Sequence, residues 1–271
     1  MATFTVSGLF VYPIKSCKGV ALTQVHHSLR GFVHDREWAV IDEPTRKVLT
    51  QREVPRLCLI RTAIQGGELA FGAAGGGDMR IPIGIEDDPD VRRLDVEVWG
   101  AKVPAVDEGM WPAGWFSSFL RRRCRLVRFD RAHVRRSQAL DSSSMAFADA
   151  HELLVISEAS LADLNARLET PLQMDRFRPN IVVSGCPAYA EDDWPALSVA
   201  SVRMSGADPC VRCVVTTTDQ ATGERGKEPL RTLAGYRKTT KGVIFGRNFN
   251  AHNGGFIRLG DPVSPLTNPF A

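Results

Sequence analysis

Two cysteines in the last third of the chain have a spacing that suits redox or metal chemistry. Cys210 and Cys213 form a C-x-x-C motif with Arg212 between the thiols, which favours a thiolate. Structural zinc needs four ligands, and the sequence has no second C-x-x-C motif or spaced histidine pair. A redox pair is expected at the start of a helix, whereas a strand-like segment follows Cys213. Two interpretations stay open: a pair of buried structural cysteines, or one thiolate ligand for a soft metal.

Three cationic side chains lie at the ends of apolar segments and suit an anion. Lys15 lies in a polar loop over residues 12–19, which lacks the glycine spacing of a phosphate-binding P-loop. Arg36 and Arg178 each lie at the entrance to an apolar segment, where a guanidinium group can bind phosphate through two donors. Surface ion pairs are the commoner case for each. Together the three residues predict an anion site, with Cys213 for a soft metal.

The chain carries one strongly basic segment. Residues 121–136 hold eight Arg and one Asp, a local charge of +7 in a chain whose net charge is +3. The remainder is therefore −4, so the chain is not a generally basic nucleic-acid binder. Phe129 is the only aromatic residue of the segment, which gives little support for base stacking. A solvated connector is the simplest interpretation, ahead of docking of an acidic partner protein and of nucleic acid.

Length and composition are those of a globular protein with one large or two smaller domains. The chain has 271 residues, of which 44% are hydrophobic and 24% charged. It contains no apolar run long enough for a membrane helix, and no secretion signal is visible at its start. We therefore expect a cytoplasmic protein whose six cysteines are reduced thiols.

Short segments rich in Val, Ile and Leu, interrupted by Pro and Gly, predict mainly strands. Six glycines within residues 66–78 predict a loose turn, and the arginine-rich segment passes into Asp141-Ser-Ser-Ser144 at an expected domain boundary within residues 125–145. Helices are expected over residues 110–120 and 157–168, the second capped by a serine. Strands are expected over residues 4–12, 37–42, 47–50, 57–62, 94–99, 181–184, 197–204, 214–217, 242–245 and 256–259.

Motifs spread over residues 7–263 resemble, in the same order, those of the MOSC family, in the branch with mitochondrial amidoxime-reducing components and bacterial YcbX-type proteins. The resemblance implies an α+β, β-rich fold with a MOSC N-terminal (MOSC_N) β-barrel-like lobe over residues 1–125. A C-terminal MOSC β-barrel would follow over residues 126–271, with a cofactor in the crevice between the two. The matching motifs include Tyr12-Pro-Ile-Lys-Ser-Cys-Lys-Gly19, Asp35-Arg36-x-Trp38, Thr50-Gln-Arg52, Phe177-Arg-Pro-Asn-Ile181, Ala190-Glu-Asp-Asp-Trp194, Cys210-Val-Arg-Cys213 and Glu228-Pro-Leu-Arg-Thr-Leu233.

The resemblance implies a molybdenum cofactor (Mo-molybdopterin), in which a pterin dithiolene with a terminal phosphate holds the metal. By position, Cys213 matches the protein thiolate on Mo, and Cys210 is a supporting residue. Asp149 is expected to act in catalysis, and either it or His151 would relay protons. The mitochondrial branch has small hydroxyl residues where this chain has Ala150 and His151. The implied cofactor-binding residues are Lys15, Ser16, Arg36, Ala150, His151, Arg178, Asn180, Arg212, Cys213 and Asn248.

The implied activity is that of a molybdenum-dependent oxidoreductase, which reduces small N-hydroxylated compounds by removing oxygen from the N–O bond. The alternative is a carrier of the cofactor, or a sulfur-transfer protein that uses Cys213. The chain ends without the four-cysteine signature of a ferredoxin domain, so electrons are expected from a separate ferredoxin, flavodoxin or other flavoprotein, or cytochrome b5-like protein. An acidic donor would dock at Arg121, Arg122 and Arg123. Neither nucleic acid nor a membrane is an expected partner.

Overall fold

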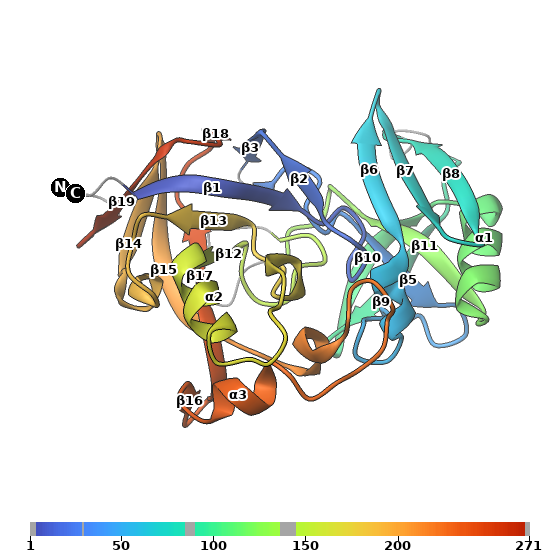
Figure 1. Cartoon of the computed structure of the whole chain (residues 1–271). Coiled ribbons are helices and arrows are strands. Elements are labelled where there is room, and N and C mark those ends of the chain that lie inside the picture. Colours follow the sequence, from blue (N-terminus) through green and yellow to red (C-terminus); the bar gives the residue numbers. More distant parts are fainter. Residues whose placement is uncertain (1–3, 29, 85–89, 136–144, 269–271) are drawn as a thin grey trace.

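Strands form most of the regular structure, which confirms the β-rich fold predicted from the sequence (Figure 1). The computed structural model describes residues 4–28, 30–84, 90–135 and 145–268. Two β regions lie side by side in Figure 1, a barrel on the left and a pair of smaller sheets on the right. None of the helices in these described ranges is long and apolar enough to cross a membrane.

The barrel is a closed sheet of seven strands. The first and last of the seven strands in sheet order, β12 and β17, pair with each other. This pairing closes the barrel and leaves none of the seven strands with a free edge. β1 pairs with β13 on one side and β19 on the other, so both ends of the chain contribute to the barrel. In sheet order the strands are β12 (Leu153–Ser157), β13 (Ile181–Ser184), β1 (Phe4–Val11), β19 (Pro262–Leu266), β14 (Ala196–Val199), β15 (Val202–Val211) and β17 (Gly242–Ala251).

Apolar side chains of the strands fill the barrel. Val6 and Leu9 of β1, Val155 of β12 and Phe249 of β17 belong to one buried apolar cluster. Burial of these side chains is the main stabilising contribution to this half of the molecule. Short strands extend the barrel at its margins: β2 (Val20–Leu22) beside β1, β16 (Lys238–Thr239) beside β17, and the separate sheet of β18 (Gly255–Arg258), β3 (Gln24–Ser28) and β4 (Gly31–Phe32).

The second region combines a four-stranded and a three-stranded antiparallel sheet. The helix α1 (Met110–Leu120) covers them through Phe116 and Phe119, which pack against Phe71 and other buried residues. This helix has the bounds that the sequence predicts. The four strands are β5 (Trp38–Asp42), β11 (Cys124–Phe129), β10 (Ala101–Asp107) and β9 (Arg93–Val98), and the three are β6 (Arg61–Gln65), β7 (Glu68–Ala73) and β8 (Gly77–Pro82).

The remaining helical segments are short. Ser157 caps α2 (Glu158–Asn165), because its side chain accepts a hydrogen bond from the Ser160 amide at 3.0 Å, as the sequence predicts. Further along the chain, α3 (Leu230–Ala234) packs beside β17. Single 3-10 turns occupy η1 (Pro55–Leu59), η3 (Met174–Arg176), η4 (Ala190–Asp193) and η5 (Val214–Thr217).

Two predicted strands are wrong because the apolar segments close into 3-10 turns. Residues 57–62 form the end of η1 and the start of β6, since Pro55 fixes φ and has no amide for a ladder. Residues 214–217 form η5, in which the Thr216 amide donates to the Cys213 carbonyl at 3.1 Å. A short apolar run does not distinguish a strand from a buried turn; the available pairing partners decide.

Three further segments also differ from the prediction. Residues 66–78, predicted as a loose turn, contain β7, which pairs with β6 on one side and β8 on the other. Residues 47–50 form isolated pairs, such as Val48 with Ile41, instead of a strand. The predicted strand over residues 197–204 is two strands, β14 and β15, joined by a turn in which Ala200 has a φ of 50°.

The arginine-rich segment is not a solvated connector over Cys124–Phe129, because these residues form β11, a buried strand between β5 and β10. Arg125 pairs with Asp107 and Arg128 with Glu108, at 2.7 and 2.8 Å. The exposed residues of the segment are also offset: Arg122 pairs with Asp42, Arg123 with Glu43 and Arg131 with Glu37. Five of the seven arginines of this segment that the structure describes therefore pair with carboxylates. Residues 141–144 lie outside the described residues.

Candidate functional site

A cavity of about 370 Å³ gathers residues from distant parts of the chain. Its walls come from the loops around β5, from the segment before β12, from residues 176–180 and from the end of β15. All eleven residues that the sequence assigned to catalysis or cofactor binding line it: Lys15, Ser16, Arg36, Asp149, Ala150, His151, Arg178, Asn180, Arg212, Cys213 and Asn248.

Three of these residues hold a backbone conformation that is unusual for any residue except glycine. Ser16, Arg36 and Arg178 have φ angles of 69°, 51° and 56°. Non-glycine residues in this left-handed region are uncommon and concentrate at functional sites. Gln51 fixes the Ser16 loop, since its backbone N–H donates to Ser16 Oγ at 3.2 Å and its side-chain Nε2 donates to the Ser16 carbonyl at 2.7 Å.

Tyr12 supports the two guanidinium groups. Arg36 Cζ lies 4.4 Å and Arg178 Cζ 4.1 Å from the centre of the Tyr12 ring, which is within the range of cation–π attraction. The Tyr12 hydroxyl donates to the Pro179 carbonyl at 2.8 Å. Burial raises the pKa of Tyr12, and the two arginines oppose that shift without cancelling it. The phenol is therefore neutral, and the pair of cations depends on its ring for support.

Asn180 links Arg36 to the barrel. Its Oδ1 accepts from Arg36 Nη1 at 3.0 Å and from the Leu154 amide at 3.2 Å, and its Nδ2 donates to the Phe10 carbonyl at 3.2 Å. Asp35 forms an ion pair with the same Nη1. The side chain of Asn180 thus orients Arg36, and it lies on the wall of the cavity.

Lys15 and Asp149 form an ion pair inside the cavity. Lys15 Nζ also donates to the Phe147 carbonyl at 2.6 Å, and Arg52 Nη2 lies 3.6 Å from Asp149 Oδ2. Burial lowers the pKa of Lys15, although Asp149 opposes the shift. Burial acts against ionisation of Asp149, but Lys15, Arg52 and Arg36 together hold the pKa of this carboxyl well below its usual range. Asp149 is therefore an ionised hydrogen-bond acceptor at neutral pH.

The C-x-x-C segment turns sharply at its second cysteine. Cys213 is half-buried and precedes η5, so its side chain lies at the end of β15. Arg212 Nη1 donates to Cys210 Sγ at 2.9 Å, and its Nη2 donates to the Phe177 carbonyl at 2.6 Å. Arg212 Nε is buried, and no hydrogen-bond partner for it exists within the described ranges. A bound acceptor would satisfy this donor.

His151 and Asn248 occupy the barrel side of the cavity. His151 Nδ1 is 3.2 Å from Asn250 Nδ2, and burial lowers the pKa of the imidazole, with Asp208 opposing. The ring is therefore neutral at neutral pH. Asn248 Nδ2 donates to the Asp208 carbonyl at 3.1 Å. Neither residue brings a positive charge to this wall.

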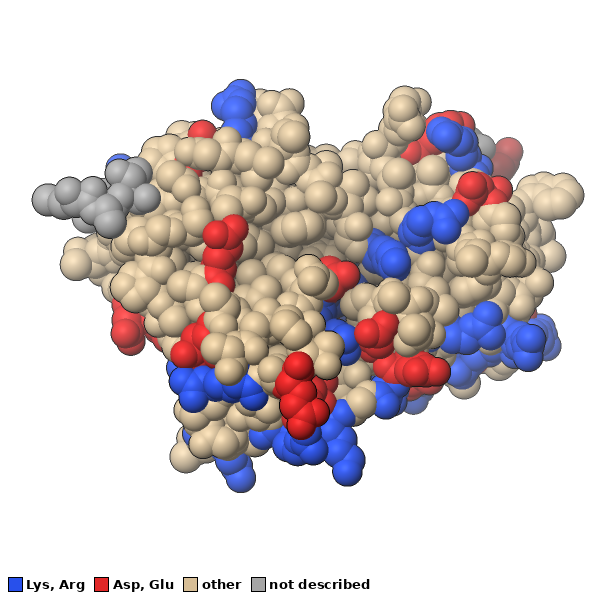
Figure 2. Space-filling model, in the orientation of Figure 1, with Lys and Arg blue, Asp and Glu red and all other residues tan. Residues whose placement is uncertain are grey.

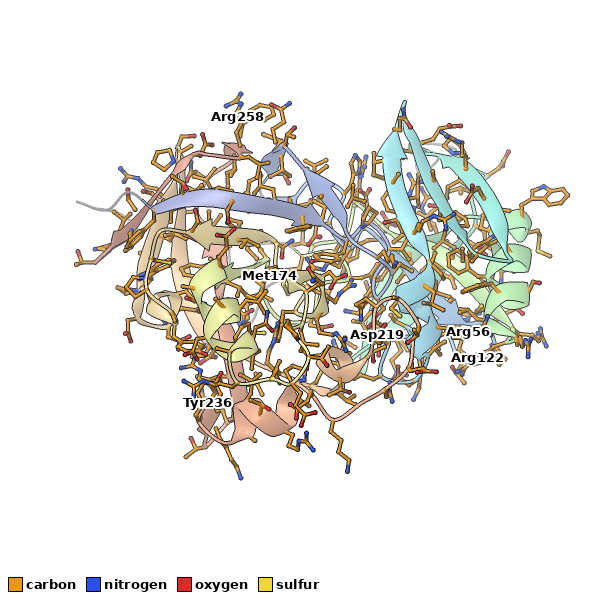
Figure 3. The ribbon with its side chains drawn as sticks, viewed as in Figure 1. Arg56, Arg122, Met174, Asp219, Tyr236 and Arg258 are labelled. Atoms are coloured by element: carbon orange, nitrogen blue, oxygen red, sulfur yellow. The ribbon has the colours of Figure 1, made fainter. Side chains whose placement is uncertain are left out.

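The cavity is nevertheless strongly cationic, because six Lys and Arg side chains line it against a single carboxylate, Asp149. Sequence reasoning had not assigned Arg52 and Arg176 to the site. Two features of the sequence could have indicated them: Arg52 ends the Thr50-Gln-Arg52 motif, and Arg176 lies two positions before Arg178. Arg176 pairs at 3.1 Å with Asp219, which is labelled in Figure 3. The six cations are Lys15, Arg36, Arg52, Arg176, Arg178 and Arg212.

The donor set fits an anionic cofactor that brings its own metal. No three His, Cys, Asp or Glu side chains of the described residues converge so that they could hold a metal ion by themselves. A metal beside Cys213 would therefore take its other ligands from the cofactor. Thiolate suits a soft metal, and the surrounding cations suit a phosphate and an anionic dithiolene.

Comparison with known proteins shows which family the chain is similar to. The family model described as the MOSC N-terminal beta barrel domain matches residues 3–123, and the model described as the MOSC domain matches residues 142–264. Mitochondrial amidoxime-reducing component 1 of Homo sapiens is 38% identical over 96% of this chain and 82% of its own length. Mitochondrial amidoxime reducing component 2 of Rattus norvegicus is 37% identical, over 96% and 82%.

Proposed function

This chain belongs to the family of MOSC-domain proteins, and on that premise we propose that it binds a molybdenum cofactor in the cationic cavity and reduces N-hydroxylated compounds. One observation carries the proposal: eleven residues matched to this chemistry by sequence line one cavity. Six cations and a half-buried cysteine in the same cavity suit an anionic pterin dithiolene and its metal. Relatives that are named for amidoxime reduction align with almost the whole chain.

Cofactor binding divides the residues into two groups. Cys213 would supply the protein thiolate to the metal, and Arg212, with an unsatisfied Nε, would donate to the cofactor beside it. Arg36 and Arg178, supported by Tyr12, would bind its anionic groups. When bound, the cofactor supplies the two-electron redox chemistry that cleaves an N–O bond.

Reduction of an amidoxime to an amidine consumes two electrons and two protons and releases water. Asp149 is ionised at neutral pH and has no proton of its own to donate, and its half-exposed carboxylate accepts a hydrogen bond from Lys15 Nζ. Lys15 carries the proton within this pair, and Asp149 connects it to solvent. We assign proton supply to this pair, with His151 as a neutral neighbour.

Electrons come from a separate redox protein of the ferredoxin, flavoprotein or cytochrome b5-like class. A protein donor requires a docking surface. In Figure 2, basic and acidic side chains are interspersed over the visible face rather than segregated. Arg122 and Arg123 pair with carboxylates and, with Arg121, lie outside the cavity lining. Docking at these three arginines stays a prediction, tested below.

The decisive experiment measures metal content and turnover on the same preparation. Protein made in a host that synthesises the cofactor should contain about one Mo per chain, with matching pterin fluorescence. With a small chemical reductant it should convert benzamidoxime into benzamidine, and chromatography measures the amount of product. A preparation that loses its cofactor on gel filtration and shows no turnover would contradict the reductase and support a cofactor carrier. A Cys213 persulfide without turnover would support sulfur transfer.

A further inference from the structure

An unusual turn lies beside the cavity. Trp99 and Gly100 join β9 to β10 as a two-residue hairpin loop, since Val98 pairs directly with Ala101. Both turn residues have positive φ, 52° for Trp99 and 82° for Gly100. Such turns favour Asn-Gly, Asp-Gly or Gly-Gly, because a bulky side chain is unfavourable in the left-handed region. A tryptophan at the first position is an outlier that calls for a functional explanation.

Arg52 connects this tryptophan to the cavity. Its guanidinium carbon lies 4.7 Å from the centre of the Trp99 ring, and its Nη2 lies 3.6 Å from Asp149 Oδ2. Arg52 lines the cavity and Trp99 does not, so the indole lies next to the lining, one side chain away from Asp149. Arg225 Nη2 donates to the Arg52 carbonyl at 2.6 Å and holds the backbone of Arg52 in place.

The indole is stacked on a cation and yet open to solvent. Trp99 is 58% exposed, although it has a partner in Arg52. A cation–π contact occupies part of the ring surface and leaves the rest for a ligand. Exposure of a large aromatic side chain is costly unless a partner covers it.

Exposed apolar side chains also lie close to Cys213 in the chain. Val211, which lines the cavity, is 45% exposed, and Val214, which follows Cys213, is 37% exposed. The cavity lining carries six cations, whereas Val211, Val214 and Trp99 are apolar and exposed. Such a site suits a ligand with a polar reacting group and a flat apolar body.

We propose that Trp99 is a specificity-determining residue, whose exposed indole stacks against the aromatic body of an N-hydroxylated substrate while the N–O group enters the cavity. This inference rests on the proposed reductase function. Aromatic pairs gain attraction beyond simple burial when their rings are offset or edge to face. An aliphatic substrate has no such ring, so Trp99 discriminates between the two classes.

The test compares benzamidoxime with acetamidoxime, which carry the same reacting group on a phenyl and a methyl substituent. Trp99→Ala should raise the KM for benzamidoxime by about two- to tenfold and leave the KM for acetamidoxime and both kcat values near wild type. Trp99→Phe should restore most of the selectivity. Trp111→Ala is the matched control, because Trp111 is an exposed tryptophan on α1 (84%) and is not the ring on which the cavity residue Arg52 stacks.

Trp99→Asn separates a role in folding from a role in recognition. Asparagine is favoured in this turn, so the variant should unfold at a temperature no lower than wild type and still lose selectivity for benzamidoxime. An equal rise of the KM values for both substrates, or KM values for both that stay at the wild-type level, would overturn the proposal. The first result would show that Trp99 acts only through Arg52.

Fluorescence gives a binding measurement that does not depend on turnover. Benzamidoxime should quench tryptophan emission more strongly than acetamidoxime, and Trp99→Phe should abolish that difference whereas Trp111→Phe retains it. Selective quenching without turnover would contradict the proposed reductase and leave the aromatic subsite standing. Turnover without selective quenching would contradict the subsite and leave the reductase standing.

Discussion

The ammonium group of Lys15 and the carboxylate of Asp149 form an ion pair on the cavity wall, although 134 positions separate them in the chain. Lys15 comes from the loop after β1, and Asp149 from the segment before β12. The contact holds together two loops that carry several of the cavity residues. It therefore connects the stability of the cavity to the ionisation of one carboxyl group.

Asp149→Asn should destabilise the protein at neutral pH and have less effect in acid. The pKa of Asp149 in the folded chain lies below its ordinary value of 3.8, so its contribution is present above that value and is lost as pH falls through the folded pKa. We expect a decrease in the free energy of unfolding on the order of 1 kcal/mol at pH 7, because the carboxylate is half-exposed and screened. Urea denaturation should show the difference shrinking from about pH 4 downward. A difference that is constant with pH would show that charge is not its source.

Cys213→Ala should abolish turnover and change the metal coordination while the fold stays intact. The thiolate ligand is lost, but the side chain is only half-buried and its removal leaves a small cavity. Cys210→Ala is the matched control, since Cys210 Sγ accepts from Arg212 and would affect the cofactor indirectly. X-ray absorption at the Mo edge should show one fewer sulfur ligand in the Cys213 variant alone. Loss of that ligand in the Cys210 variant instead would refute the assignment.

Arg178→Ala should weaken retention of the cofactor more than Arg176→Ala. Arg178 donates to the Cys17 carbonyl at 2.6 Å and stacks on Tyr12, whereas Asp219 neutralises Arg176. Pterin fluorescence after extensive dialysis measures the cofactor retained per chain. Because both arginines line the cavity, equal losses would mean that the overall charge matters and not the position of Arg178.

Arg128→Met should be strongly destabilising. Arg128 is fully buried, pairs with Glu108 at 2.8 Å and lies over the Trp38 ring at 4.8 Å. Removing one partner of a buried ion pair leaves a buried charge and costs about 3–5 kcal/mol. Arg123→Met, which removes an exposed pair with Glu43, should cost less than about 1 kcal/mol. Urea denaturation of the two variants compares the effects directly, and similar losses would count against burial as the cause.

Changing Arg121, Arg122 and Arg123 together to Glu should slow turnover driven by an acidic protein donor. Turnover driven by a small chemical reductant should stay unchanged, and added salt should slow the wild type with the protein donor. Arg122 and Arg123 already pair with Asp42 and Glu43, so urea denaturation must accompany the assay. A parallel fall in both assays would show that the segment is structural. No effect in either assay would place the donor elsewhere.

The sequence predicted both bounds of α1 and the serine-capped start of α2, because helical spacing and a serine cap are local signals. The chemistry of the site was also local in part. The loop around Lys15, the Arg178-Pro-Asn180 segment and the C-x-x-C motif are short stretches whose residue types point to anion and soft-metal binding. Long-range pairing is a different matter, since β7 looked like a loose turn until β6 and β8 were beside it.

Residue types and local spacing by themselves indicated Lys15, Arg36 and Arg178 for an anion and Cys213 for a soft metal, because side-chain chemistry and short spacing are written in the sequence. The other candidate site residues followed from the resemblance to the MOSC family. Only the tertiary structure decided how the charges combine. From the sequence, residues 121–136 were interpreted as a solvated connector or, second, a docking surface. In the structure β11 buries Arg125 and Arg128, which pair with Asp107 at the end of β10 and with Glu108. Conversely, Arg52 had no assigned role until folding placed it between Trp99 and Asp149. Electrostatic energy depends on distance in space and on burial, and neither quantity can be read from separation along the chain.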